Sequence, residues 1–172
     1  MVIDGNILEH TASAIVSPAN SFGYMDGGLD LKYSRYFGWE LESKLRGKLE
    51  REHFGEIPVG NALIIETGRE DISFFISAPT MRVPANIAET PNAYLAFKAI
   101  LQAVLAHNQT ATLPIKSILC PGLGTGEGRL PANLCARQMY RAYEVCILRN
   151  FLTKGGLARA VDDHLYLLGK ET

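Results

Sequence analysis

Short apolar runs alternate with longer amphipathic stretches along this chain, a pattern typical of strands and helices layered as α/β. The apolar runs are continuous, with no regular alternation of apolar and polar residues, as expected of strands that are covered on both faces. The pattern predicts four strands, which span Ala12–Ser17, Ala62–Glu66, Phe74–Ala78 and Ile115–Cys120.

The amphipathic stretches predict helices between and after these strands. In the first, leucines at positions 41, 45 and 49 form one stripe, the spacing of a helix with one buried face. The second begins with Thr90 as a cap and a proline in the first turn, where the missing N–H costs nothing. The predicted helices span Trp39–Glu52, Thr90 to Val104 and Pro131 to about Arg149.

The length of 172 residues predicts one domain that covers residues 1–172, since domains of roughly 100–200 residues are the rule. Hydrophobic residues make up 47% of the chain, which is enough for a sizeable core. The C-terminal segment 151–172 has two possible assignments. There Lys154 and two glycines break the third helix, and His164–Leu168 fits a last strand or a docked tail.

The charge is nearly balanced, with 17 Lys and Arg against 18 Asp and Glu. General nucleic-acid binding and binding to anionic membranes rest on clustered positive charge, so we expect neither partner. The sequence starts without the basic and long apolar regions of a signal peptide, and Ala99–Ala106 is too short to span a bilayer. Cys135 and Cys146 fit buried positions in a reducing compartment. The sequence therefore predicts a soluble cytoplasmic protein.

Two glycine-bearing loops, Ser17–Asp30 and Pro121–Pro131, each follow a predicted strand and precede a helix. In an α/β sheet, ligands bind beyond the carboxyl ends of the strands. Glycines let a backbone approach closely and point its amides at an anion, and the next helix adds its positive N-terminal dipole. Two such loops can clamp a diphosphate from both sides without a lysine. Ordinary tight turns are the alternative interpretation of the same glycines.

The common phosphate-binding fingerprints do not match these loops. No lysine follows the glycines as GxxxxGK[ST] requires, and glycines at 122, 124, 126 and 128 do not form GxGxxG. Kinases, P-loop NTPases and dinucleotide dehydrogenases are therefore disfavoured. The four histidines share no spacing that suggests zinc, and no Cys–His pair lies near a loop, so we expect no metal or other cofactor.

Several motifs together resemble the macro domain family. They are Asp4–Ile7, Ala14–Asn20, Met25–Asp30 and the late run Pro121–Gly128, supported by Val59–Ala62 and Ile76–Pro79. The resemblance covers roughly residues 2–150, and its most specific part is the first loop. It implies a mixed, largely parallel central sheet flanked by helices on both faces. It also implies binding of ADP-ribose, and some members hydrolyse ADP-ribosyl linkages.

By position in the family's motifs, the resemblance assigns roles to particular residues. Asn20 would hold the distal ribose of ADP-ribose, and Asp30 aligns with an acid that hydrolytic members place near that ribose. Asn6 and Ile7 sit where the family reads adenine. The amides near the diphosphate would come from Gly27, Gly28 and Leu29 on one side and from Gly124, Thr125, Gly126, Glu127 and Gly128 on the other.

Both candidate catalytic residues also have structural explanations. An acid such as Asp30 is favoured in the first turn of a helix, and an asparagine such as Asn20 often caps a turn. The family's adenine-side aromatic has three candidate counterparts, Phe22, Tyr24 and Tyr166, and each also fits a core position.

Three residues depart from the family pattern. Asn6 replaces the usual adenine-reading aspartate, Ser17 replaces the first asparagine of the first loop, and Glu127 places an acid in a phosphate loop.

Three functions follow as hypotheses. The first two are a binding module for ADP-ribose or an ADP-ribosylated macromolecule, and a hydrolase of ADP-ribosyl esters, ADP-ribose-1″-phosphate or modified bases in which water attacks at the distal ribose. The third is a diverged domain that has no nucleotide ligand and acts through protein–protein contacts. The sequence does not determine the oligomeric state.

Overall fold

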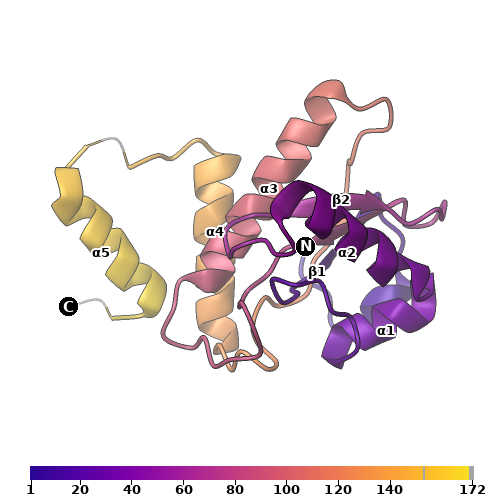
Figure 1. Cartoon of the computed structure of the whole chain (residues 1–172). Coiled ribbons are helices and arrows are strands. Elements are labelled where there is room, and N and C mark those ends of the chain that lie inside the picture. The colour runs from indigo at the N-terminus through magenta and orange to yellow at the C-terminus, as the bar shows by residue number, and fades with distance from the viewer. Residues whose placement is uncertain (153, 171–172) are drawn as a thin grey trace.

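The computed structural model describes residues 1–152 and 154–170 of the chain, so the predictions for Thr153, Glu171 and Thr172 lie outside the described residues. The elements form a central sheet with helices on both faces and one helix set apart (Figure 1). In chain order they are η1 Ile7–Glu9, β1 Ala14–Ser17, α1 Gly28–Phe37, α2 Glu40–His53, β2 Leu63–Glu66, β3 Phe74–Ser77, α3 Asn92–Thr110, β4 Ile118–Leu119, α4 Ala132–Cys146 and α5 Gly156–Leu168.

The sheet has the order β2-β3-β1-β4. Strand β1 is parallel to both of its neighbours, with Val16 opposite Ile76 in β3 and Ile15 opposite Leu119 in β4. Only β2 runs antiparallel, on the outer edge of β3. The sheet is therefore mixed and largely parallel, as predicted.

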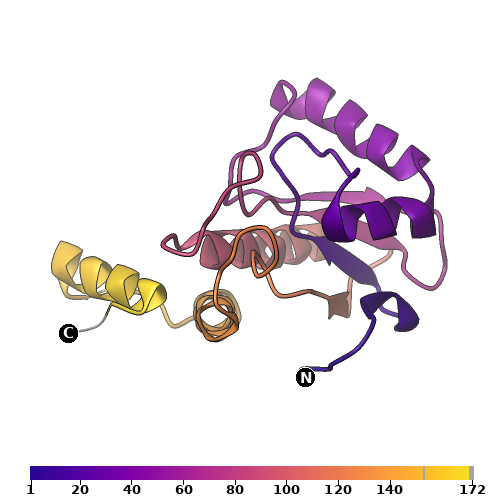
Figure 2. The same ribbon diagram turned by 90° about the horizontal axis from the view of Figure 1, so that it is seen from below.

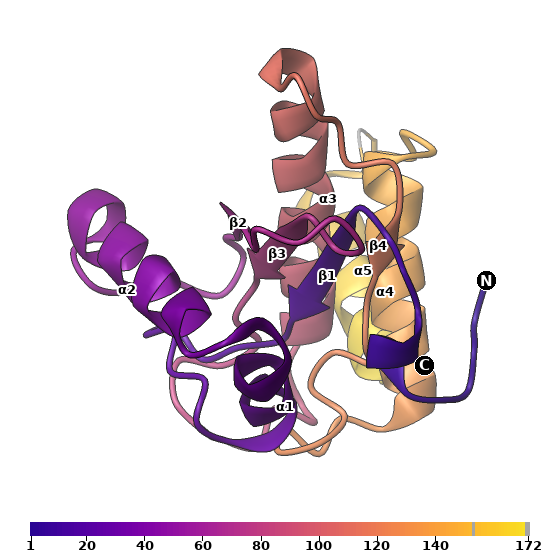
Figure 3. The ribbon, with the colours of Figure 1, turned by 90° about the vertical axis from the view of Figure 1, so that its right-hand side faces the viewer.

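Alternate residues of the strands pack into two separate hydrophobic cores, one on each face of the sheet. On one face, Ile15 and Phe75 pack with Tyr33 of α1 and with the leucine stripe of α2, which the sequence predicted. On the other face, Val16 and Ile76 pack with α3 and α4 (Figure 3). The three-layer arrangement predicted from the resemblance is confirmed.

Two of the predicted strands are less buried or shorter than expected. All four residues of β1 and of β3 are buried, but β2 is an edge strand with one exposed and one half-buried residue. The predicted strand Ile115–Cys120 is reduced to two paired residues, because the chain reaches the sheet only at its edge. Ile115 is buried, but its backbone is held by the Asn108 side chain and not by a strand.

The predicted helices differ from the observed ones mainly at their ends. Helix α3 begins at Asn92 with Pro91 as its N-cap, and it extends to Thr110, beyond the predicted stretch. Helix α4 ends at Cys146, before Arg149. Helix α1 was not assigned by the sequence pattern, because it buries only Tyr33 and Ser34.

The open assignment at the C-terminus is decided in favour of a helix. Helix α5 is flanked by Gly155 as its N-cap and Gly169 as its C-cap, both in the left-handed region, at φ 94° and 69°. Its C-terminal half packs on α4, where Leu167 is buried and its carbonyl accepts from Gln138. Asp163 pairs with Arg141 of α4 at 2.7 Å. No helix among the described residues is long and apolar enough to cross a membrane.

Candidate functional site

The two glycine-bearing loops follow the carboxyl ends of β1 and β4, which are neighbouring parallel strands. Figure 3 shows α1 and the loop that enters α4 at the same end of the molecule. The segment after β3 connects the two loops. Its Arg82 carbonyl accepts from Ser21 of the first loop, and its Ile87 N–H donates to Gly128 of the second. The fold therefore brings together the two loops that the sequence singled out.

Asn20 uses its whole side chain to hold the first loop. Its Oδ1 accepts from the N–H groups of Phe22 at 3.0 Å and Tyr24 at 3.3 Å, and its Nδ2 donates to the Tyr24 carbonyl at 2.9 Å. Its backbone forms an isolated parallel bridge with Met81. The turn-capping explanation of Asn20 is thus correct for this structure, and its contact with a ribose stays a prediction.

Ser17 and Asp30 form a direct hydrogen bond across thirteen residues of sequence. The Ser17 hydroxyl, at the end of β1, is fully buried and donates to a carboxylate oxygen of Asp30 in the first turn of α1. Burial raises the pKa of Asp30 from 3.8 to about 6, the Ser17 bond opposes that rise, and nearby Glu42 adds to it. The family's asparagine is therefore replaced by a residue that contacts the candidate catalytic acid.

Tyr33 and Cys120 complete the surroundings of Asp30. Tyr33 donates its hydroxyl to the Val16 carbonyl at 3.1 Å, and its pKa is raised by burial and then by the charge of Asp30. Burial also raises the pKa of the Cys120 thiol, so this cysteine stays protonated and is a poor nucleophile. The ionisable group nearest to physiological pH in this cluster is Asp30.

Helix α1 presents its N-terminus at the surface beside Asp30. Gly27 is the N-cap, Gly28 has φ +57°, and both are exposed. No side chain of the described chain caps the helix through a hydrogen bond. The first amides of a helix have no partner within it, so they are available to an anion.

The end of the first loop is anchored by polar contacts to the next two helices. Glu42 of α2 accepts from the Met25 N–H at 3.1 Å, and Ser34 donates to the Met25 carbonyl at 2.9 Å. These contacts join the loop to α1 and α2. The sequence pattern did not single out Glu42; its position in the first turn of α2, near the loop, was the only available signal.

The second loop is held by its backbone. The carbonyl of Gly124 accepts from Leu130 at 3.0 Å, and that of Gly128 accepts from Ile87 at 2.8 Å. A Cβ on Gly128 would lie 2.5 Å from the Gly124 carbonyl oxygen, and one on Gly124, where φ is +74°, would overlap Ile87. These two glycines are required by close packing.

Gly126, between them, is different. It is exposed, its φ lies outside the left-handed region, and a Cβ there would meet nothing within 4 Å. Thr125 and Glu127 are exposed as well, so the acid of this loop lies at its surface. The tip of the loop is therefore open, while its base is closely packed.

Asn6 and Ile7 lie on η1, before β1. Asn6 is exposed and caps η1, with its Oδ1 accepting from Leu8 at 3.2 Å and its Nδ2 donating to Glu9 at 3.2 Å. Ile7 is half-buried and packs against the core formed with α1 and α2. An adenine contact at these residues stays a prediction.

The three candidate aromatic side chains are each paired with an arginine. Phe22 lies under Arg82, with 4.9 Å from the guanidinium carbon to the ring centroid. Tyr24, which is 46% exposed, lies under Arg46 at 4.5 Å. Tyr166 belongs to α5 and packs with Arg137 of α4. Phe22 and Tyr24 are thus on the candidate loop, and Tyr166 is part of the α4–α5 contact.

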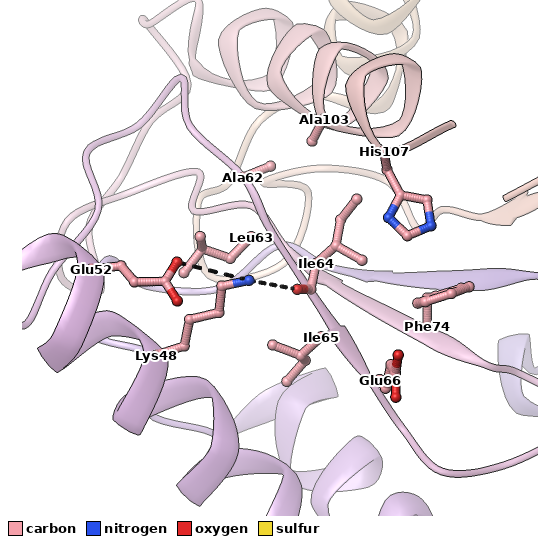
Figure 4. Close-up of a pocket in the computed structure, with 10 residues that line it drawn as sticks. All are labelled: Lys48, Glu52, Ala62, Leu63, Ile64, Ile65, Glu66, Phe74, Ala103 and His107. Atoms are coloured by element: carbon pink, nitrogen blue, oxygen red, sulfur yellow. Dashed lines mark hydrogen bonds and ion pairs between the residues drawn. The ribbon is translucent and has the colours of Figure 1, made fainter. Parts of the chain in front are cut away.

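Two surface cavities lie away from these loops. One, of about 290 Å³, lies beside edge strand β2, where Lys48 donates to the Ile64 carbonyl and approaches Glu52 (Figure 4). The other, of about 660 Å³, lies at the amino ends of the strands and is lined in part by Ser13, Asp71 and Ser117. Within the described part of the chain, no group of three or more His, Cys, Asp or Glu side chains is arranged to hold a metal ion.

Sequence comparison identifies the family. The Macro-like domain family matches residues 6–170, so the chain belongs to that family. A relative from Aquifex aeolicus is 36% identical over 138 residues, which cover 80% of this chain and 76% of the relative. One from Aeropyrum pernix is 31% identical over 82% of this chain and 68% of its own length. Both relatives are described only as uncharacterized proteins.

Solved structures with the same fold agree with this assignment. The macrodomain of Mycobacterium tuberculosis DarG is 22% identical, with a TM-score of 0.68 over 82% of this chain and 87% of its own. The Oceanobacillus iheyensis macrodomain, solved with ADP, has a TM-score of 0.66 and 22% identity over 80% of this chain and 70% of its own. Thermosipho africanus DarTG, solved in complex with ADP-ribose, has a TM-score of 0.64 and 18% identity over 81% of this chain and 37% of its own.

Proposed function

We propose that this protein binds ADP-ribose, free or attached to a macromolecule, between its two glycine-bearing loops. The observation that carries the proposal is the uncapped N-terminus of α1, whose exposed amides lie at the carboxyl end of β1 next to Asp30. A helix N-terminus of this kind binds a diphosphate without basic side chains. The ligands named for the Oceanobacillus and Thermosipho structures, ADP and ADP-ribose, support the same ligand here.

The variants made of the Oceanobacillus macrodomain support the assignment of the first loop. In separate structures an asparagine, a glycine and an aspartate of that protein are substituted. The three positions are spaced by seven residues and then three, as are Asn20, Gly27 and Asp30 in this chain. The same three residue types at the same spacing favour equivalent positions in the two loops.

The open tip of the second loop forms the other wall of the proposed diphosphate site. Its base is fixed by Gly124 and Gly128, which leaves Gly126 with free space where a phosphate oxygen would lie. Glu127 is exposed and therefore does not have to point at the ligand.

Hydrolysis of an ADP-ribosyl linkage is the finer part of the proposal. Asp30, with a pKa of about 6, titrates near the pH at which a general base or acid must exchange protons. Ser17 holds one carboxylate oxygen, so the other oxygen is the one that can take a proton from a water attacking the anomeric carbon. A phosphate of the substrate is the alternative proton acceptor.

A second candidate function is a domain that has no nucleotide ligand and acts through protein contacts. Two observations favour it. Both polar atoms of the Asn20 side chain form hydrogen bonds within its own loop, and the two cavities described above lie away from both loops. On this alternative, the two loops keep the backbone conformation of the family but no longer bind a nucleotide.

Calorimetric titration with ADP-ribose, ADP and AMP separates these functions. We expect ADP-ribose to bind more tightly than ADP, and AMP to bind much more weakly, because AMP lacks the diphosphate and the distal ribose. Gly126→Val should weaken ADP-ribose binding by about 100-fold or more at unchanged thermal stability, since the added side chain fills only the open tip. Gly126→Ala is the matched control, with a smaller effect. No binding of any of the three ligands by the folded wild type would favour the second candidate.

A further inference from the structure

One face of α4 is apolar and uncovered. Figure 2 views α4 nearly end-on, with α5 on one side, α3 and β4 on others, and no chain over the remaining side. Five exposed residues at helical spacing, which we call the α4 stripe, share this face. They are Ala132, Ala136, Tyr140, Tyr143 and Ile147.

The α4 stripe exposes large side chains that a core would normally bury. Tyr140 is 58% exposed, Tyr143 is 40% exposed and Ile147 is 41% exposed. The two tyrosine rings stack on each other, with centroids 6.4 Å apart, and no charged residue interrupts the stripe. Such a contiguous patch marks an interaction surface more often than a solvated face.

The α4 stripe is complementary to itself. Its N-terminal half carries two alanines, and its C-terminal half carries Tyr143 and Ile147. If two copies of α4 pack antiparallel about an axis beside Tyr140, Ala136 lies opposite Tyr143 of the partner subunit, and Ala132 lies opposite Ile147 of the partner subunit. Each large side chain then meets a small one, which is the size match that close helix packing needs.

The exposed area agrees with this arrangement. The stripe and its neighbour Leu148, which is 56% exposed, present apolar surface on the order of 400 Å² per copy. Two copies would bury roughly 800–1,000 Å², near the lower limit for a specific interface.

The chain after α4 leaves two more large apolar side chains exposed. Phe151 and Leu152 are 49% and 41% exposed.

We infer that the protein forms a two-fold symmetric dimer through the α4 stripe, with the two α4 helices antiparallel. An interface of this size is weak and reversible. The inference rests on α4 alone and does not depend on the proposed ligand.

Sedimentation velocity tests the dimer. We expect the wild type to shift from monomer to dimer between about 2 and 200 μM, the range for a small interface. Ala136→Arg should keep the protein monomeric over that range, because a long charged side chain would meet Tyr143 of the partner subunit. Ala106→Arg, at an exposed position of α3, is the matched control and should dimerise like the wild type. A wild type that stays monomeric, or a dimer that Ala136→Arg leaves intact, would overturn the inference.

Cysteine cross-linking tests the antiparallel register. Ala136→Cys and Tyr143→Cys are made as separate proteins and oxidised alone and mixed, with the wild type as the background for its own free cysteines. The mixture should give a disulfide-linked dimer, and each variant alone should not. Equal linking of each variant with itself would show a different pairing of the helices and would overturn the proposal. Circular dichroism of each variant confirms that it is folded.

Discussion

The two glycine-bearing loops sit side by side on neighbouring strands, but they are built in opposite ways. The first loop is held by side chains: Asn20 bonds its own turn, Ser17 bonds Asp30, and Glu42 bonds Met25. The second loop is held by backbone bonds and by the absence of side chains at Gly124 and Gly128. The first loop therefore supplies an ionisable side chain, and the second supplies a closely packed backbone of fixed shape.

This difference predicts how each loop responds to substitution. In the first loop, changing a side chain should alter reactivity or pH dependence, because the titrating group is there. At the base of the second, adding a single methyl group should matter more than changing charge, because closely packed backbone leaves no room for it.

The largest effect is expected for Asp30→Ala in turnover. On an ADP-ribosylated substrate that the wild type cleaves, this variant should be slower by about 10²–10⁴-fold, the usual contribution of a general base. ADP-ribose affinity should change far less. The measurement is release of ADP-ribose under saturating substrate, with the exposed Asp26→Ala as control. Turnover like the wild type would leave the substrate's own phosphate as the proton acceptor.

The next effect concerns the base of the second loop. Gly128→Ala should lower the free energy of unfolding by about 1–3 kcal/mol, the usual cost of overpacking, because its Cβ would lie 2.5 Å from the Gly124 carbonyl oxygen. Gly126→Ala in the same loop should change stability by less than about 0.5 kcal/mol. Urea denaturation measures both. Equal effects of the two variants would contradict the distinction between a packed base and an open tip.

A smaller effect is expected in the pH dependence of stability. Because the pKa of Asp30 is raised to about 6 in the folded state, the folded protein binds this proton more tightly than the unfolded chain. The resulting stabilisation is fully present below about pH 4 and is lost as the pH rises through 6. Asp30→Asn, which can still accept from Ser17, should therefore be more stable than the wild type at pH 7.5 by about 1–2 kcal/mol.

That advantage of Asp30→Asn should vanish near pH 4. Thermal denaturation of the variant and the wild type across this range gives the difference directly. Asp26→Asn, at an exposed position, should show no such pH-dependent difference. A constant difference between Asp30→Asn and the wild type would argue against a raised pKa for Asp30.

The smallest effect is expected at Asn6, outside both loops. A carboxylate accepts a stronger hydrogen bond from an adenine amino group than an amide does, so Asn6→Asp should tighten adenine-containing ligands by about 1 kcal/mol. Because Asn6 also donates to Glu9, the variant is best made with Glu9→Gln, which removes the repulsion between two acids. Titration with ADP-ribose and its hypoxanthine analogue measures the change. Unchanged selectivity would exclude a base contact at Asn6.

Much of the fold could be predicted from local sequence patterns. The apolar runs at β1 and β3, the leucine stripe of α2 and the two glycine loops follow from periodicity and turn chemistry over a few residues, and all were correctly located. The family resemblance added the mixed, largely parallel sheet flanked by helices on both faces and the candidate site residues. Local patterns failed where burial was slight, as in α1, or where a strand met the sheet only at its edge, as in β4.

The chemistry of the candidate site came from contacts between distant residues. Asp30 looks like an ordinary helix-start acid until Ser17, thirteen positions earlier, and Glu42, on another helix, are brought against it. Likewise, no residue near Gly128 in sequence indicates that the Ile87 N–H will donate to its carbonyl. A pKa depends on how much water the whole fold removes from a group, and a close approach depends on where separate elements come to rest. Neither quantity is encoded in a short stretch of chain, and both exist only after the layers have packed.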